Sequence, residues 1–126
     1  MTAAASGIGL AAARRLAAEG ARLALCDIDG GNLSTAAQTL GVDPARLLLA
    51  TVDVRDKAQL EAFVADAARL HGRIDVLVNN AGAGRRGRVQ DLSDDDWRHV
   101  MGVSLDSVFQ ACRAAMPHLV ATRGAI

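Results

Sequence analysis

The chain of 126 residues contains no tyrosine, and aromatic residues make up only 2% of it. Alanine and small aliphatic side chains must therefore fill the interior, which suits helices packed closely on a sheet better than an aromatic-rich β-sandwich. Lysine and arginine total 14, aspartate and glutamate also total 14, and the formal net charge is zero. This balance argues against nucleic acid or an anionic membrane as the main partner, because both require a basic surface.

Cysteine is also scarce, with only Cys26 and Cys112 in the chain. Two cysteines without a CxxC spacing form neither a disulfide framework nor a zinc motif, so we expect reduced thiols and a cytoplasmic location. The three histidines have no ligand spacing, and no metal site is expected. No uncharged apolar run reaches the roughly 18 residues of a membrane span. The apolar segment 1–13 has no basic residue before it, unlike a signal peptide.

Short aliphatic runs alternate with longer helical stretches along the chain. We expect strands at 21–26, 47–52 and 74–78, a further strand that begins at Gly124, and helices at 9–19, 33–40, 57–71 and 94–116. Two of these helices start with the spacing of a capping box, which is provided by Asp56 with Gln59 and by Ser93 with Asp96. This order predicts a single α/β domain over 1–126, with a parallel sheet and helices on its faces.

Two helices carry apolar residues at spacings of three and four, which is typical of a face packed on a core. In the helix at 57–71 these residues are Leu60, Phe63, Val64, Ala67 and Leu70. In the helix at 94–116 the stripe consists of Trp97, Val100, Met101, Ser104, Leu105, Val108 and Cys112. We expect both sets to face the sheet; for the second set, packing against another subunit stays open as an alternative.

A glycine-containing turn opens the first helix at Gly7–Gly9, where backbone N–H groups can approach a pyrophosphate closely. Alone, these glycines would indicate only a tight turn. Asp27 adds an acidic residue at the end of the next strand, about 20 residues later, where a carboxylate binds the adenosine ribose. The same carboxylate would repel the 2′-phosphate of NADP, and its neighbours Cys26 and Ile28 offer no positive charge. The pattern predicts NAD as the cofactor.

Five separated segments resemble the classical branch of the short-chain dehydrogenase/reductase family, in the order and spacing of that family. They are Thr2–Gly9, Asp27, Asp53-Val54, Asn79–Gly82 and Trp97–Phe109. The resemblance implies a Rossmann-like doubly wound parallel sheet, a nicotinamide dinucleotide cofactor, and hydride transfer between an alcohol and a carbonyl.

The resemblance also implies cofactor-binding roles for ten residues. Those expected to hold the pyrophosphate and ribose are Ser6, Gly7, Ile8 and Gly9. Asp27 matches the ribose-binding acid of members that prefer NAD, and Asp53 with Val54 matches the pair that flanks the adenine. The segment expected to line the cofactor after the third strand is Asn80, Ala81 and Gly82. For Asn79 and Asn80 a purely structural role, as a hydrogen-bonded strand end and turn, stays open.

The chain departs from the family pattern at two matching positions. Ala3 stands where the family has its first loop glycine, and if that position needs a positive φ, the Cβ costs on the order of 1 kcal/mol. Ser104 stands where the family has an asparagine that supports the catalytic lysine through water. We expect the Ser104 hydroxyl to bond instead to a carbonyl of its own helix.

The family's catalytic serine, tyrosine and lysine would follow the strand that begins at Gly124, and the only lysine here is Lys57, on an unrelated helix. The resemblance also places a first strand before Thr2, between the strands at 21–26 and 74–78. We therefore expect a portion truncated at both ends, without turnover by itself. Unpaired backbone on both neighbouring strands predicts marginal stability or association through exposed edges.

Three hypotheses follow from these observations. The chain is the cofactor-binding part of an NAD-dependent oxidoreductase, a non-catalytic module that binds NAD or dimerises, or a remnant without function. The expected partners are a nicotinamide dinucleotide and, for the second hypothesis, another copy or a full-length relative.

Overall fold

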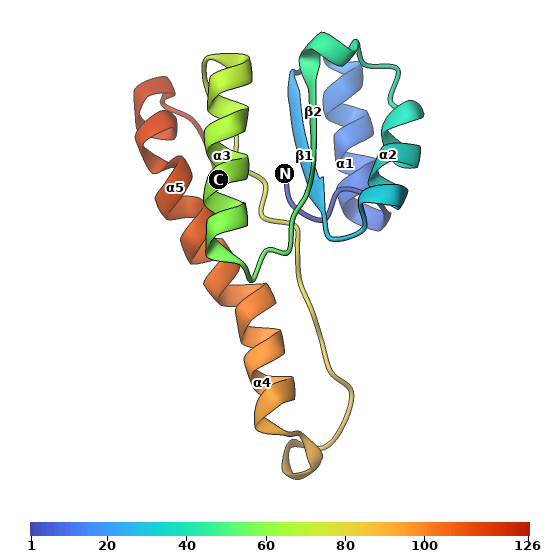
Figure 1. Ribbon diagram of the computed structural model, residues 1–126, viewed down its shortest axis with the longest axis vertical. Helices are drawn as coiled ribbons and strands as arrows, with labels where there is room; N and C mark the ends of the chain where they lie inside the picture. The colour runs from blue at the N-terminus through green and yellow to red at the C-terminus, as the bar shows by residue number, and fades with distance from the viewer.

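The computed structural model describes all residues, 1–126 (Figure 1). Two strands and five helices follow in the order α1 (Gly7–Ala18), β1 (Leu23–Asp27), α2 (Gly30–Gln38), β2 (Leu47–Thr51), α3 (Lys57–His71), α4 (Asp94–Met101) and α5 (Ser107–Thr122). Short 3-10 turns lie at Pro44–Arg46 and Val89–Asp91, and a π-helical turn at Gly102–Asp106 joins α4 to α5.

The sheet is parallel and has helices on both faces. β1 and β2 pair in register from Leu23 opposite Leu47 to Asp27 opposite Thr51. Helices α1 and α2 cover one face, and α3 and α5 lie on the other (Figure 1). This arrangement is an α/β, Rossmann-like, doubly wound fold in partial form, as the sequence predicts.

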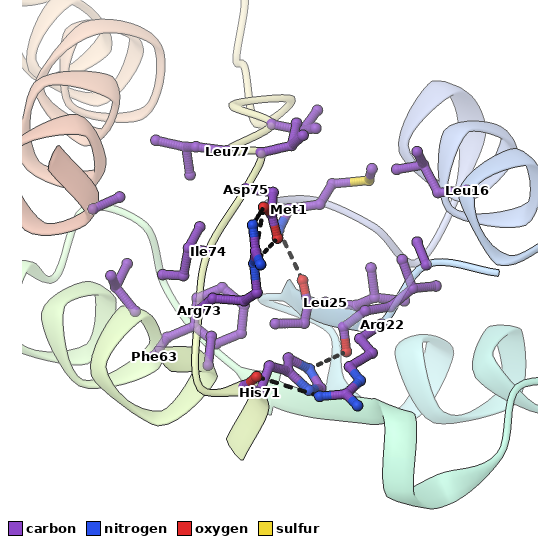
Figure 2. Close-up of a pocket in the computed structure, with 18 residues that line it drawn as sticks. Met1, Leu16, Arg22, Leu25, Phe63, His71, Arg73, Ile74, Asp75 and Leu77 are labelled. Atoms are coloured by element: carbon purple, nitrogen blue, oxygen red, sulfur yellow. Dashed lines mark hydrogen bonds and ion pairs between the residues drawn. The ribbon is translucent and has the colours of Figure 1, made fainter. Parts of the chain in front are cut away.

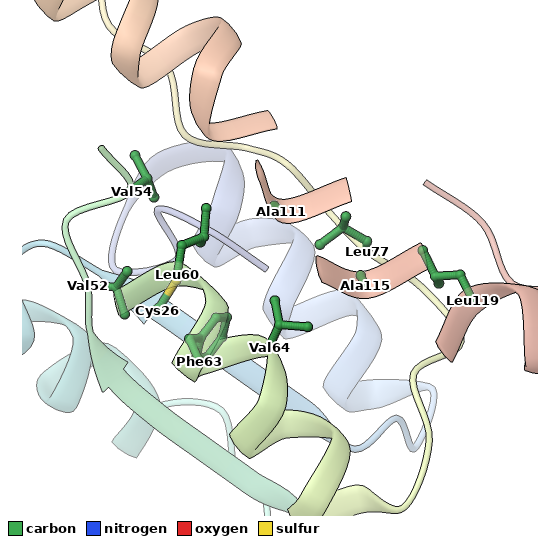
Figure 3. Packing of buried hydrophobic residues seen from close by; sticks show 10 residues of the cluster. All are labelled: Cys26, Val52, Val54, Leu60, Phe63, Val64, Leu77, Ala111, Ala115 and Leu119. Carbon is green, nitrogen blue, oxygen red and sulfur yellow. The ribbon is translucent and has the colours of Figure 1, made fainter. Parts of the chain in front are cut away.

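The hydrophobic core is divided by the sheet into two clusters. The larger cluster joins the sheet to α3 and α5 (Figure 3) and contains Cys26, Val52, Val54, Leu60, Phe63, Val64, Leu77, Ala111, Ala115 and Leu119. The smaller cluster packs α1 and α2 on the opposite face and contains Ala4, Ala5, Ala13, Leu23, Leu25 and Leu33. Both clusters contain buried alanines, in keeping with the scarcity of aromatic residues.

The strand expected at 74–78 is reduced to a single parallel bridge between Val76 and Ala125. On that side the Leu77 N–H donates to the Ala125 carbonyl at 3.0 Å, and the Ala125 N–H donates to the Asp75 carbonyl at 2.9 Å. On the side facing β1, only the Val78 carbonyl is bonded, by the Thr2 N–H at 3.1 Å. A strand requires a repeated ladder, and neither neighbour supplies one along this segment. The strand expected at Gly124 is the same bridge.

The helix starts predicted at 57 and 94 agree with the structure, whereas α1 and α2 begin at Gly7 and Gly30, before the predicted positions 9 and 33. The Ser93 side chain accepts from the Asp96 N–H at 3.1 Å, and the Asp96 carboxylate accepts from the Ser93 N–H at 3.2 Å, which completes a capping box. The Asp56 carboxylate accepts from the Ala58 and Gln59 N–H groups at 2.9 and 3.1 Å. Gln59 does not return to the Asp56 backbone; its side chain donates to the Asp56 carboxylate at 2.9 Å.

The prediction that the apolar stripe of the last helix is buried against the sheet is wrong for several of its residues. Trp97 is 64% exposed and Leu105 is also exposed, whereas the buried positions of α5 are Ser107, Ala111, Ala115 and Leu119. The π-helical turn at Gly102–Asp106 adds residues to one turn, so the stripe of α4 does not continue on the same face of α5. In α3 the predicted face is buried except for Leu70, which lies in the last turn and is exposed. None of the helices combines the length and apolar character needed to span a bilayer.

Candidate functional site

The first turn of α1 presents unpaired backbone donors at the carboxyl edge of the sheet. The first hydrogen bond of the helix runs from the Leu10 N–H to the Ser6 carbonyl at 3.0 Å, so the N–H groups of Gly7–Gly9 have no partner. The Ser6 side chain makes no capping bond, and Ile8 is 81% exposed. Free N–H groups at a helix N-terminus attract an anion such as a pyrophosphate.

Gly9 in the first turn of α1 and Ala3 in the loop before it determine how closely the backbone packs. A Cβ at Gly9 would collide with the Ala3 carbonyl oxygen and lie 2.6 Å from the Asn80 side-chain nitrogen, so only glycine fits there. Ala3 has a φ of +50°, which is the left-handed region. Position 3 therefore does require a positive φ, and the Cβ of Ala3 strains the backbone there.

Asp27 links the end of β1 to the loop before α1. Its Oδ2 accepts a hydrogen bond from the Ala5 N–H at 2.9 Å, and its Oδ1 accepts one from the Asp29 N–H at 3.1 Å. Each carboxylate oxygen has a second lone pair available, so the half-buried side chain can still accept hydrogen bonds from a pair of hydroxyl groups. Asp27 forms no ion pair with any basic residue of the chain.

Thr2 and Asn80 connect the loop before α1 to the segment after Val78. The buried Thr2 hydroxyl accepts from the N–H groups of Asn80 and Ala81 at 3.1 and 3.0 Å. The Asn80 side-chain nitrogen donates to the Ala3 carbonyl at 2.9 Å. Sequence reasoning missed Thr2 as a positioning residue, because its partners lie 78 and 79 positions away. The cofactor roles predicted for Asn80 and Ala81 stay predictions.

Asp53 is paired with a residue that sequence reasoning also missed. The Arg55 Nε donates to both carboxylate oxygens of Asp53, at 3.0 and 3.1 Å, and the Arg55 Nη1 lies 3.4 Å from Nδ1 of His99. Hydrogen bonding from Arg55 holds the pKa of Asp53 below its ordinary value. The adjacent Val54 is buried in the larger core cluster and also lines the site.

The hydrogen bonds of Ser104 differ from those that the sequence predicts. Its hydroxyl donates to the Ala83 carbonyl at 3.2 Å and accepts from the Ala83 N–H at 3.1 Å, so the expected bond to a carbonyl of its own helix is wrong. The bond to a carbonyl of the same helix is made instead by Ser107, which donates to Val103 at 2.6 Å. Ser104 lies in the π-helical turn, which orients its hydroxyl toward the loop after Gly82.

These elements surround a cleft of about 230 Å³ at the carboxyl edge of the sheet. Its lining residues are Ala3, Asp27, Ile28, Val52, Asp53, Val54, Arg55, Ala81, Gly82, Ala83, His99 and Val103. Five of the ten predicted site residues therefore share one cleft. Ser6 and Gly7–Gly9 lie at the start of α1, and Asn80 braces the loop before that helix. Apolar walls for a base, carboxylate acceptors for a ribose and free N–H groups for a pyrophosphate fit a dinucleotide.

The comparison with protein families agrees with this geometry. The family model described as short chain dehydrogenase matches residues 1–126. The chain therefore belongs to the short-chain dehydrogenase family, whose members are NAD(P)-dependent oxidoreductases.

Individual relatives show the same similarity. Meso-2,3-butanediol dehydrogenase of Serratia marcescens is 40% identical over 126 residues, which are 100% of this chain and 49% of that protein. An alcohol dehydrogenase of Thermococcus sibiricus, solved with 5-hydroxy-NADP, superposes with a TM-score of 0.92 at 32% identity, covering 99% of this chain and 54% of that one. Carveol dehydrogenase of Mycobacterium avium, solved with NAD, gives 0.85 at 31% identity and covers 96% and 48%.

The chain thus spans about half the length of the curated relatives it matches. Within it, no group of three or more potential ligands is placed to hold a metal ion.

Proposed function

We propose that this chain is the NAD-binding part of a short-chain oxidoreductase that transfers hydride between an alcohol and a carbonyl. The observation that carries the proposal is Asp27, whose carboxylate lies at the end of β1 and bonds to the Ala5 N–H of the loop before α1. The ribose hydroxyls would donate to the remaining lone pairs of this carboxylate. The pyrophosphate would lie against the free N–H groups of Gly7–Gly9 and the exposed Ser6.

The charge around Asp27 favours NAD over NADP. The neighbouring Asp29 adds a second carboxylate, and no basic residue pairs with either of them. A 2′-phosphate would face both carboxylates, and two unit charges 4 Å apart repel by about 1 kcal/mol in water and about 4 kcal/mol near a protein surface. The adenine would lie along the apolar wall formed by Val52 and Val54, beside the Asp53–Arg55 pair.

The nicotinamide, when bound, supplies the hydride chemistry. This chain's residues bind and orient the cofactor: Thr2 and Asn80 fix the loop before α1, and Ser104 fixes the backbone at Ala83. Proton transfer to a reacting oxygen requires an acid or base within hydrogen-bond reach. The titratable side chains that line the cleft are Asp27, expected at the ribose, and the contacting Asp53, Arg55 and His99, expected beside the adenine. We therefore infer that this chain binds the cofactor without turnover by itself.

Fluorescence titration of NADH into the chain tests this function, with an alcohol panel and NAD⁺ as the parallel activity assay. Saturable binding without turnover supports the proposal. The matched variants are Ile28→Arg, which places a cation beside Asp27, and Ile126→Arg, an equally exposed position remote from the site. Ile28→Arg should shift the preference toward NADPH. Failure of NADH to bind at millimolar concentration would exclude the function.

A second candidate function, a dimerisation module, is favoured by the exposed apolar side chains Trp97, Leu105 and Phe109 on α4, the π-helical turn and α5. This surface would associate with another copy or with a full-length relative. Sedimentation of Phe109→Glu against the unchanged chain tests it, because a dimer formed through this surface dissociates in the variant. The proposed function also includes a cytoplasmic location, which is consistent with the two free cysteines.

A further inference from the structure

Two clefts of the molecule differ in the polar groups that they present. The larger cleft, of about 420 Å³, lies between β1 and the segment 73–78, and 14 of its 18 lining residues are hydrophobic. Its polar side chains contact one another or backbone carbonyls (Figure 2). The candidate cofactor cleft, of about 230 Å³, instead has Asp53, Arg55 and His99 in contact with one another in its lining. The proposed function places the base of the dinucleotide beside these three side chains.

The Asp53 carboxylate has no acceptor position left for a ligand. Its Oδ1 accepts from the Arg55 backbone N–H and from the Arg55 Nε, both at 3.0 Å. Its Oδ2 accepts from the same Nε at 3.1 Å and from the Arg55 Nη2 at 2.5 Å. An ionised carboxylate offers about four lone-pair positions, and Arg55 contacts all of them. A base can therefore donate an N–H to Asp53 only by displacing Arg55.

Contacts with α4 and with the π-helical turn hold Arg55 in this position. The Arg55 Nη1 lies 3.4 Å from Nδ1 of His99. Because a guanidinium only donates, this Nδ1 accepts, and the imidazole proton lies on Nε2. The stem of Arg55 packs over Gly102, where an added Cβ would lie at contact distance, 3.5 Å from the Arg55 Cγ. Displacing Arg55 would therefore break contacts with Asp53, with His99 and with the π-helical turn.

The side-chain groups that remain free beside Asp53 are donors. Of the five N–H groups of a guanidinium, those on Arg55 that contact Asp53 and His99 leave two without a partner. The Nε2–H of His99 also has no partner in the chain. Adenine presents an N6 amine donor beside its N7 acceptor, whereas a 6-oxopurine such as hypoxanthine or guanine presents two acceptors, O6 and N7. Arginine pairs readily with the O6 and N7 edge, so the free donors match a 6-oxopurine.

We propose that Arg55 lets this end of the cleft hold a 6-oxopurine as readily as adenine, which rests on the proposed function because the base belongs to the dinucleotide bound there. Arg55 occupies the carboxylate that would otherwise accept the adenine amine. In its place Arg55 presents N–H groups that bond to the O6 of hypoxanthine or guanine. Arg55 is thus a specificity-determining residue, and the ligand class widens to nicotinamide dinucleotides with a 6-oxopurine as the second base.

Fluorescence titrations of NADH and of reduced nicotinamide hypoxanthine dinucleotide test this specificity in the full chain. Both ligands carry the same fluorescent nicotinamide, so only the base differs. The hypoxanthine dinucleotide should bind more tightly than NADH or no more than about twofold more weakly. In Arg55→Ser the Asp53 carboxylate is free, and NADH should bind at least about fivefold more tightly than the analogue, which is the effect of one hydrogen bond. Arg69→Ser breaks an Arg–Asp pair on the exposed surface of α3 and should behave as the unchanged chain.

NMR of the Arg55 side chain gives a second measurement that does not depend on how the variants fold. The Arg55 Nε–H signal should keep its position and its slow exchange with either dinucleotide bound, because the contact with Asp53 persists. Release of this group by NADH, a preference for NADH above about twofold in the unchanged chain, or no gain of preference in Arg55→Ser would overturn the proposal alone. Absence of binding of either dinucleotide would reject the NAD-binding function, and this specificity with it.

Discussion

Replacing Ala3 by glycine should stabilise the fold, because Ala3 adopts a φ of +50°. A side chain in the left-handed region costs about 1–2 kcal/mol, whereas glycine adds about 0.5–1 kcal/mol of entropy cost in folding. The difference predicts a net gain of about 0.5–1 kcal/mol in the free energy of unfolding. With a urea m-value of about 2 kcal/mol/M, the unfolding midpoint should rise by about 0.25–0.5 M.

The matched control for this prediction is Ala11→Gly, in the exposed interior of α1, where the backbone is helical. There glycine should lower stability by about 1 kcal/mol. Urea unfolding followed by circular dichroism measures both variants. A loss of stability in Ala3→Gly equal to that in Ala11→Gly would refute the reasoning, because it would mean that the left-handed conformation at Ala3 carries no strain.

The remaining predictions concern single side chains. Arg55 lowers the pKa of Asp53 in the folded chain, so the ionised carboxylate stabilises the fold. This stability is present above the unfolded pKa of about 4 and is lost as pH falls through the lower, folded pKa. The urea midpoint should therefore drop less between pH 6 and pH 3 in Arg55→Gln than in the unchanged chain. Burial raises the pKa of Cys26 to about 11, so at pH 8 iodoacetamide should leave Cys26 unmodified in the folded chain and modify it in urea, as mass spectrometry of peptides would show; modification in the folded chain would contradict its burial. Thr2→Val leaves two N–H groups without their acceptor and should cost about 2 kcal/mol in urea unfolding, whereas Thr2→Ser keeps the hydroxyl and should cost less; equal losses would exclude the hydroxyl as the cause.

The features that the sequence predicted well depend on neighbours close in the chain. The caps at Asp56 and Ser93 are formed with residues two or three positions away. The alternation of strands and helices similarly identified the fold class. In each case the signal and its physical cause lie within one turn or one strand.

The features that it missed depend on distant partners or on small changes of helical register. The Thr2 hydroxyl accepts from the Asn80 and Ala81 N–H groups, and the Asn80 side chain donates to the Ala3 carbonyl. These bonds join segments far apart in the chain, and no periodic pattern marks them. The strand expected at 74–78 has suitable side chains, but a strand is defined by its partners. The π-helical turn at Gly102–Asp106 does not follow from the apolar spacing, and it moves the buried face away from Trp97 and Leu105.

The central claim, that Asp27 makes this chain an NAD-binding unit, is tested most directly by calorimetric titration of NAD⁺ and NADP⁺ into the unchanged chain and Asp27→Asn. Asp66→Asn removes an equally charged side chain, on the exposed surface of α3, and serves as the control. The account predicts that the unchanged chain and Asp66→Asn bind NAD⁺ at least tenfold more tightly than NADP⁺, and that Asp27→Asn loses most of this preference. Equal affinity for both dinucleotides in the unchanged chain, or a preference that survives in Asp27→Asn, would contradict it.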